Sequence, residues 1–139
     1  MTSTMSRSNL DIIRRLYANG PERDLDGFLG AMAPDVEWRF ADSFIYGQVN
    51  PLIGREAIRD GSLARIGAEW DGFKAVPDEV IDAGDTIIGL GHYVGVHKAT
   101  GRKLRAQFAH IFTLADGQVT RWRQYVDTRQ FAEVSGAYD

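Results

Sequence analysis

The chain of 139 residues contains no cysteine, and this absence removes several classes of chemistry. Without cysteine there is no disulfide framework, no thiolate nucleophile and no thiolate metal site. Only three histidines are present, and they are scattered along the chain without clustered acids beside them. No metal-ligand spacing is therefore visible, and we expect neither a metal nor a cofactor.

Long hydrophobic runs are also missing. No apolar stretch approaches the roughly 18 residues that a membrane helix needs. The opening MTSTMSRSN is short and polar, with no hydrophobic region behind its arginine, so it does not resemble a secretory signal. We expect a cytoplasmic protein without membrane contact, in which residues 1–7 are flexible and residues 8–139 form a single domain.

Positive charge is scarce as well. The net charge is −3, which argues against a nucleic-acid surface. Hydrophobic residues make up 44% of the chain, enough for one domain with one core.

Helices are predicted mainly in the first half of the chain. One begins at Ser8, where SNLD has the form of a capping box, and ends at the NGP of residues 19–21. A second, shorter helix starts at Asp24 and is closed by Ala33 and Pro34. A third covers residues 55–70, although two internal glycines weaken it.

Strands are predicted for residues 36–41 and for most of the chain after residue 72. The later strands cover residues 73–82, 86–97, 102–114 and 119–127, and a short closing helix follows. The breaks between these strands are short and rich in turn residues, which is typical of an antiparallel meander. Helices followed by a curved antiparallel sheet predict an α+β fold.

The strand of residues 86–97 has two unlike faces. Gly89, Gly91 and Gly95 alternate with Tyr93 on one face, and strand glycines mark strong bending or the close approach of another group. We place a cavity over that face. The other face is apolar apart from His92. An apolar outward face favours a homodimer through the outer face of the sheet.

The ADG turn at residues 115–117 decides which way His110 points. A two-residue turn would set His110 opposite Arg123, whereas a three-residue turn with a bulge at Gly117 would set it opposite Trp122. One slipped residue exchanges the two faces. The apolar pattern favours the bulge, which turns Asp127 away and gives one face these residues: Ala106, Phe108, His110, Phe112, Trp122, Gln124 and Val126.

This face has the composition of a small-molecule pocket, mostly apolar with a few polar groups. His110 is the candidate general acid or base, because an ordinary histidine pKa near 6.5 suits proton transfer at neutral pH. Gln124 and Tyr93 are candidate donors to a developing enolate or carbonyl oxygen. The alternative is a structural His110 that bonds to Gln124. The candidate substrate-binding residues are Tyr17, Trp38, Phe40, Ala106, Phe108, Trp122 and Val126.

Four segments resemble the SnoaL-like proteins: RDLDGFLGAMAPDVEW, GREAI, VIDAGD and AHIFTLADGQVTRWRQYVDT. That family belongs to the superfamily of nuclear transport factor 2, ketosteroid isomerase, limonene epoxide hydrolase and polyketide cyclases. The resemblance extends from about Asn9 to Val134. It implies a conical α+β barrel, a strongly curved antiparallel sheet wrapped around about three N-terminal helices, and usually a dimer.

Only some of the functional residues of this superfamily have a counterpart in this sequence. The pocket histidine of the polyketide cyclases matches His110, but their acid–base aspartate falls on Gln124. The base of ketosteroid isomerase falls near Phe40, and the epoxide hydrolase triad falls on Tyr93, Gly91 and Gln124. Orthodox steroid isomerisation and epoxide hydrolysis are therefore not expected.

Three hypotheses remain open. The first is a cofactor-independent isomerase or cyclase that acts by proton transfer at His110 on a hydrophobic cyclic or polyketide-like carbonyl compound. The second is a ligand-binding or dimeric accessory module of the same fold without catalysis. The third is a pure interaction scaffold in which the side chains of Trp38 and Trp122 collapse the pocket.

Overall fold

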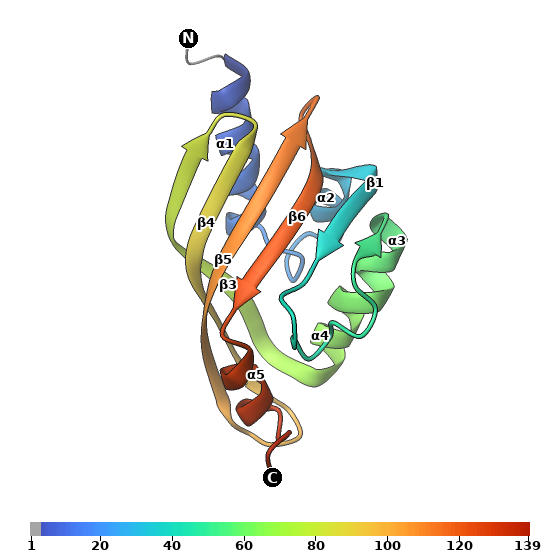
Figure 1. The fold of residues 1–139 in the computed structure, drawn as a ribbon, viewed down its shortest axis with the longest axis vertical. Helices are drawn as coiled ribbons and strands as arrows, with labels where there is room; N and C mark the ends of the chain where they lie inside the picture. The colour runs from blue at the N-terminus through green and yellow to red at the C-terminus, as the bar shows by residue number, and fades with distance from the viewer. Residues whose placement is uncertain (1–3) are drawn as a thin grey trace.

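A computed structural model describes residues 4–139 and shows a mixed sheet with helices along its concave side (Figure 1). The sheet has six strands in the order β2-β1-β6-β5-β4-β3. Its strands are β1 (Met32–Arg39), β2 (Leu52–Ile53), β3 (Trp70–Ala83), β4 (Thr86–His97), β5 (Lys103–Ala115) and β6 (Gln118–Val126). Its helices are α1 (Thr4–Ala18), α2 (Leu25–Gly30), α3 (Arg55–Ile58), the π-helical turn η1 (Arg59–Leu63), α4 (Ala64–Glu69) and α5 (Thr128–Val134).

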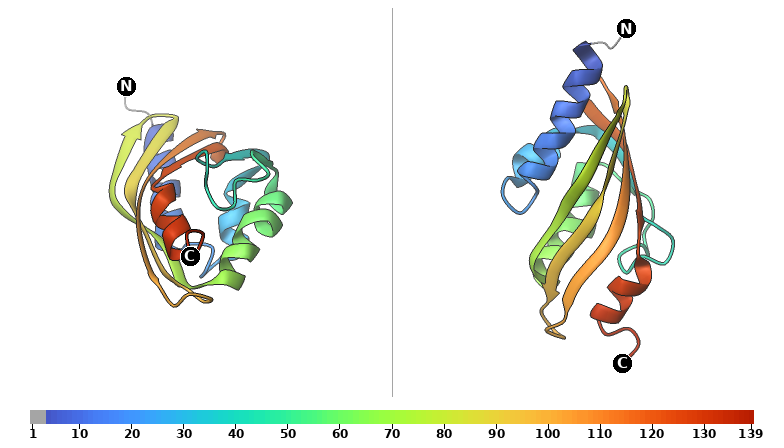
Figure 2. Two further views of the ribbon diagram at one scale, coloured as in Figure 1. Left: turned by 60° about the horizontal axis from the view of Figure 1, so that its bottom comes forward. Right: turned by 90° about the vertical axis from the view of Figure 1, so that its left-hand side faces the viewer.

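The predicted α+β class and curved sheet are confirmed. Strands β3 to β6 form the expected antiparallel meander. The sheet curls around the helices like an open cone, and Figure 2 shows α1, α4 and α5 within its curve. The sheet does not close into a barrel, because β2 and β3 remain as its two edges.

One pairing departs from the prediction of an antiparallel sheet. Strand β1 pairs in parallel with β6, with Trp38 opposite Trp122. A parallel neighbour needs a long crossover rather than a tight turn, and here most of the chain lies between the two strands. Sequence spacing gives no signal for such a distant pairing.

Several helix boundaries also differ from the predictions. Helix α1 begins at Thr4 instead of Ser8, and the remainder of the N-terminal segment expected to be flexible, residues 1–3, lies outside the described residues. Helix α2 ends at Gly30, because the chain enters the sheet at Met32, opposite Val119. The third predicted helix is divided by η1, where Gly61 lies close to the side chain of Leu52.

The core fills the cone between sheet and helices. Ile13 of α1, Val36 of β1 and Phe131 of α5 are fully buried there. Phe131 contacts the rings of Phe44 and Trp70 and so occupies the end of the cone near α5. This packing leaves the region between α1, η1 and the strands β5 and β6 for a site. Within residues 4–139, no helix is long and apolar enough to span a membrane.

Candidate small-molecule site

The β5–β6 hairpin combines two features that the sequence presented as alternatives. The turn is the two-residue form, since Ala115 pairs with Gln118 and both Asp116 and Gly117 have positive φ, at 52° and 77°. A bulge follows further along, because Leu114 pairs with Val119 whereas Thr113 pairs with Arg121.

The bulged residue, Thr120, restores the face that the sequence predicted for His110. The hairpin prediction was wrong about the turn and about the residue opposite His110, which is Gln124 rather than Trp122. It was right about the face, since His110, Trp122 and Gln124 are all buried on the concave side. Asp127 is exposed and accepts a hydrogen bond from the backbone N–H of Gln130, which caps α5.

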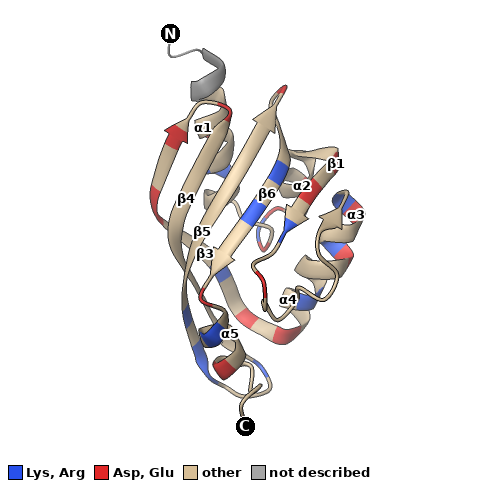
Figure 3. Cartoon of the chain, in the orientation of Figure 1, with Lys and Arg blue, Asp and Glu red and all other residues tan. Residues whose placement is uncertain are grey.

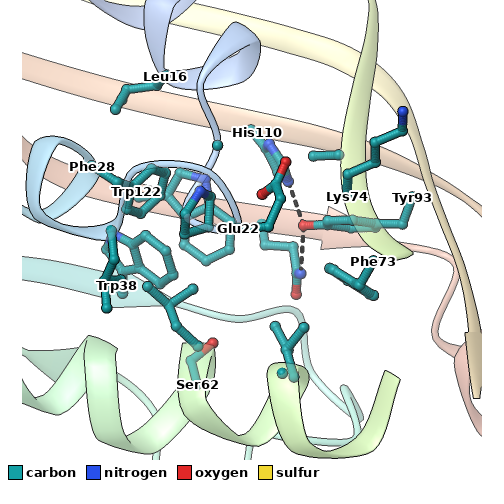
Figure 4. Close-up of a pocket in the computed structure, with 18 of the residues that line it drawn as sticks. Leu16, Glu22, Phe28, Trp38, Ser62, Phe73, Lys74, Tyr93, His110 and Trp122 are labelled. Atoms are coloured by element: carbon teal, nitrogen blue, oxygen red, sulfur yellow. Dashed lines mark hydrogen bonds between the residues drawn. The ribbon is translucent and has the colours of Figure 1, made fainter. Parts of the chain in front are cut away.

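His110 lies between two tyrosines. Its Nδ1 is 2.9 Å from the hydroxyl of Tyr17, and its Nε2 is 2.5 Å from the hydroxyl of Tyr93. Gln124 donates from Nε2 to the Tyr93 oxygen at 3.0 Å, and its Oε1 accepts from the backbone N–H of Ala41 at 3.4 Å. Figure 4 shows the bonds that converge on Tyr93.

The amide of Gln124 sets the direction of this chain of hydrogen bonds. Because the Tyr93 oxygen accepts from Gln124, its own hydrogen is available for Nε2 of His110. Nδ1–H of neutral His110 then donates to the oxygen of Tyr17. In the opposite direction the hydrogen without a partner among the described residues would belong to Tyr93, which is more deeply buried than Tyr17. The favoured arrangement leaves the Tyr17 hydrogen unused.

Burial controls the charge of all three groups. It lowers the pKa of His110 to about 3, so the imidazole is neutral at neutral pH. Burial also raises the pKa of Tyr17, with a smaller contribution from Tyr93, and raises the pKa of Tyr93 against the opposing bond from Gln124. A neutral His110 with both nitrogens bonded does not fit the expected general acid or base.

A cavity of about 550 Å³ opens beside these groups. This volume is within the range of about 300–1,000 Å³ typical of ligand pockets. Its wall is rich in aromatic rings, and Trp38 and Trp122 pack against each other with centroids 4.2 Å apart. The aromatic side chains of the wall, besides Tyr17 and Tyr93, are Phe28, Trp38, Phe40, Phe44, Trp70, Phe73, Phe112 and Trp122.

The sequence suggested open space above the glycines of β4, but the structure shows none above Gly89 and Gly91. A β-carbon at Gly89 would overlap the hydroxyl of Tyr17, and one at Gly91 would overlap the backbone carbonyl of Val76. These glycines permit close approach, which is the other meaning of strand glycine. Gly89 in particular lets the Tyr17 phenol reach His110.

The predicted site residues divide into two groups. Those that line the cavity are Tyr17, Trp38, Phe40, Tyr93, His110, Trp122 and Gln124. Ala106, Phe108 and Val126 are not part of the lining. Phe108 lies beneath His110 instead, with the two rings stacked 3.8 Å apart, and so supports the imidazole from behind.

Other lining residues were missed by the sequence reading. Glu22 and Arg23 follow α1, Leu63 belongs to η1, and Lys74 lies at the start of β3. Glu22 and Arg23 come from a turn, where hydrophobic periodicity carries no information about direction, and Lys74 follows a register shift of β3 that local alternation does not reveal. The Pro21 turn marks the Glu22 segment in the sequence, but only tertiary packing brings that turn to the cavity.

Comparisons with known proteins agree with this fold. The family profile described as "SnoaL-like domain" matches residues 13–122. Comparison with curated proteins found no match.

Solved structures show the same fold. An NTF2-like protein from Burkholderia thailandensis is 28% identical with a TM-score of 0.84, over 91% of this chain and 95% of that one. TerC, co-crystallised with polyporic acid, is 30% identical with a TM-score of 0.80, over 92% and 98% of the two chains. A protein with a ketosteroid isomerase-like fold from Catenulispora acidiphila, in complex with trimethylamine, is 18% identical with a TM-score of 0.75, over 91% and 92%, and shows likeness of fold alone.

Proposed function

The chain belongs to the SnoaL-like family, and from that membership we propose that it is a cofactor-independent isomerase or cyclase. Its substrate is a hydrophobic cyclic or polyketide-like carbonyl compound, which binds in the aromatic cavity. The reaction is proton transfer next to the carbonyl group.

The observation that carries this proposal is the directed chain of hydrogen bonds ending at Tyr17. Ala41 N–H donates to Gln124 and Gln124 donates to Tyr93, and in the inferred tautomer of His110 the donation continues through Tyr93 and His110, which leaves the Tyr17 hydrogen for a ligand oxygen. A fixed donor aimed at a developing enolate oxygen stabilises the transition state by about 3–4 kcal/mol. His110 and Tyr93 act as positioning residues, because they hold and polarise Tyr17.

The nature of the cavity supports a small hydrophobic ligand. Its wall is rich in aromatic rings, Tyr17, Tyr93, His110 and Gln124 are joined by hydrogen bonds within it, and a 30% identical relative was co-crystallised with polyporic acid. Aromatic walls on both sides suit a planar ring system.

Binding without turnover is the second candidate function. It is favoured by one observation: the buried polar groups His110, Tyr93 and Gln124 are satisfied by one another. In that case the same donor chain would only orient the ligand.

Deuterium exchange separates the two candidates. The probe is β-tetralone, a bicyclic ketone, in D₂O, with loss of its α-proton signals followed by NMR. We expect the wild-type protein to accelerate exchange, and Tyr17→Phe to reduce the acceleration by about 10²–10³-fold because the enolate loses its donor.

Quenching of tryptophan fluorescence by β-tetralone measures binding in the same samples. Binding with no acceleration by wild-type protein would favour the module without catalysis. Acceleration that persists in Tyr17→Phe would contradict the assigned donor.

We also propose a homodimer through the outer face of the sheet. In the middle of that face, β4 and β5 place apolar side chains opposite each other: Ile88 with Ile111, and Leu90 with Ala109. Figure 3 shows this part of β4 and β5 free of charged residues, in contrast to β6 with Arg121 and Arg123. An uncharged, partly buried apolar surface is suited to a second copy of the chain.

A further inference from the structure

The turn after α1 brings an acidic residue to the cavity. The backbone N–H of Arg23 donates to the carbonyl of Gly20 at 2.9 Å, and Asp24 N–H donates to the same oxygen at 3.1 Å. Pro21 occupies the second position of this turn, where its fixed φ is favourable, and Glu22 occupies the third. Tyr17 lies within the last turn of α1, so both the turn and Tyr17, which precedes it closely in the chain, line the cavity.

Glu22 is the only carboxylate among the described residues that line the cavity. Its side chain folds back over Gly20, where a β-carbon would overlap Oε2 of Glu22. Figure 4 shows the Glu22 carboxyl group directed toward the part of the cavity that holds His110 and Tyr93.

The Glu22 carboxylate has no competing partner. Among residues 8–139 it makes no hydrogen bond or ion pair, although Arg23 and Lys74 also line the cavity. Arg59, a third cation of the lining, is paired with Asp60 at 2.9 Å. The oxygens of Glu22 are therefore available to a ligand.

The other titratable groups of the lining are poor proton acceptors. His110 has both ring nitrogens bonded and a pKa lowered by burial to about 3. Tyr17 and Tyr93 stay protonated, because burial raises the pKa of each. Lysine and arginine carry their protons at neutral pH.

We propose that Glu22 is the catalytic base of this site, with Tyr17 as the donor to the substrate oxygen. This inference rests on the proposed function and names the proton acceptor that the proposed proton transfer requires. Glu22 removes a proton from the carbon next to the carbonyl, and the C–H electron pair becomes the C=C bond of an enolate. The enolate oxygen accepts the Tyr17 hydrogen bond. In a substrate with a C=C bond β,γ to the carbonyl group the enolate is a conjugated dienolate, and return of the proton from Glu22 to its γ-carbon shifts the double bond into conjugation and completes an isomerisation, with no other reactant consumed.

The exposure of Glu22 suits this role. Glu22 is exposed as well as part of the cavity lining, so solvent can return its carboxyl group to the carboxylate form between turnovers. The aromatic rings of the lining hold the ligand, and Glu22 and Tyr17 supply the polar groups that act on it. A general base placed in this way contributes about 10²–10⁴-fold to the rate.

The test uses Glu22→Gln in the β-tetralone exchange experiment. Loss of about 10²–10⁴-fold in exchange rate is expected, with the dissociation constant of β-tetralone changed by less than about threefold, because the amide keeps the shape but cannot accept the proton. The matched control is Glu56→Gln, an exposed glutamate of α3 outside the cavity lining. The control variant retains the wild-type rate and melting temperature.

A second variant moves the carboxylate without removing it. In Gly20→Ala the new methyl group displaces the Glu22 side chain, so exchange falls while the chain keeps its charge.

The outcomes separate this inference from the function on which it rests. Exchange by wild-type protein that persists in Glu22→Gln overturns the assignment of Glu22 and leaves the proposed enzyme intact. Absence of exchange in wild-type protein overturns both.

Discussion

His110 sits among aromatic rings at 3% exposure, yet none of its polar atoms lacks a partner. Buried polar groups persist in proteins when they are hydrogen-bonded, and the two tyrosines meet that condition. The bond from Gln124 to Tyr93 favours the tautomer in which Nδ1–H of His110 donates to Tyr17. At the residue scale, packing and function are therefore not alternatives for this histidine, because its structural bonds are what direct Tyr17.

The buried histidine predicts a pH-dependent stability. Below about pH 6.5 the unfolded chain binds a proton at His110 that the folded chain, with a pKa of about 3, does not bind. The stability that the folded protein gains by keeping His110 neutral is fully present above about pH 6.5. It falls as the pH drops toward 3, by up to about 1.4 kcal/mol per pH unit.

Urea unfolding of wild-type protein and His110→Phe between pH 5 and 7.5 checks this expectation. At pH 7.5 the variant is less stable, since Tyr17 and Tyr93 lose their bonds to the imidazole while Tyr93 keeps the one from Gln124, and its pH slope is smaller than that of the wild type. Equal slopes in the two proteins would mean that His110 does not titrate as assigned.

At the scale of elements, the sheet owes its site to two irregularities. The bulge at Thr120 turns Trp122 and Gln124 onto the concave face, and the glycines of β4 let neighbouring groups come close. Strand β3 carries its own register shift between Pro77 and Glu79, beside Gly91. Such shifts increase twist and curvature, which an open cone requires.

Two glycine substitutions are expected to have opposite effects. Gly91→Ala forces a methyl group against the Val76 carbonyl and lowers the free energy of unfolding by about 1–3 kcal/mol. Gly67→Ala lies in α4 with open space around the new methyl group, and it raises stability by up to about 1 kcal/mol through helix propensity. Chemical denaturation of the two variants under the same conditions measures both, and a stable Gly91→Ala would show that β3 can move away.

The whole molecule is a cone whose inner side holds the site and whose outer side carries the apolar stretch of β4 and β5. A dimer through that stretch would leave the cavity mouth free, because Glu22 and its turn belong to the helical side. Ligand binding and association then involve opposite faces of one sheet.

Leu90→Glu tests the proposed dimer. A charge in the apolar face is costly to bury, so the variant is expected to be a monomer by light scattering at concentrations where the wild type is a dimer. Lys103→Glu, an exposed change at the start of β5, is the matched control and keeps the dimer. A monomeric wild-type protein would refute the association itself.

Much of the fold could be predicted from local patterns. The alternation of residues in β4, β5 and β6 predicted the strands and placed His110, Trp122 and Gln124 on one face. Turn residues marked the meander. The helix ends were less predictable: Ser8 is a good capping residue, yet α1 continues back to Thr4.

The site was only partly predictable, because only residues in regular, periodic elements have a direction that the sequence reveals. Tyr93, His110 and Gln124 came from strands whose period is two, so their direction could be inferred. Phe108 shares their face but lies behind the histidine, because a face assignment does not say which side chains reach open space. Glu22 was missed because a turn residue has no periodic direction.

The amino-acid sequence alone determined the class of fold, the meander and the face on which His110 lies, since each depends on neighbouring residues and on a repeating period. Tertiary structure alone decided the parallel pairing of β1 with β6, the two tyrosines at His110 and the approach of Glu22 to the cavity. Those contacts join residues far apart in the chain. They form only when the whole core packs, and no local pattern encodes them.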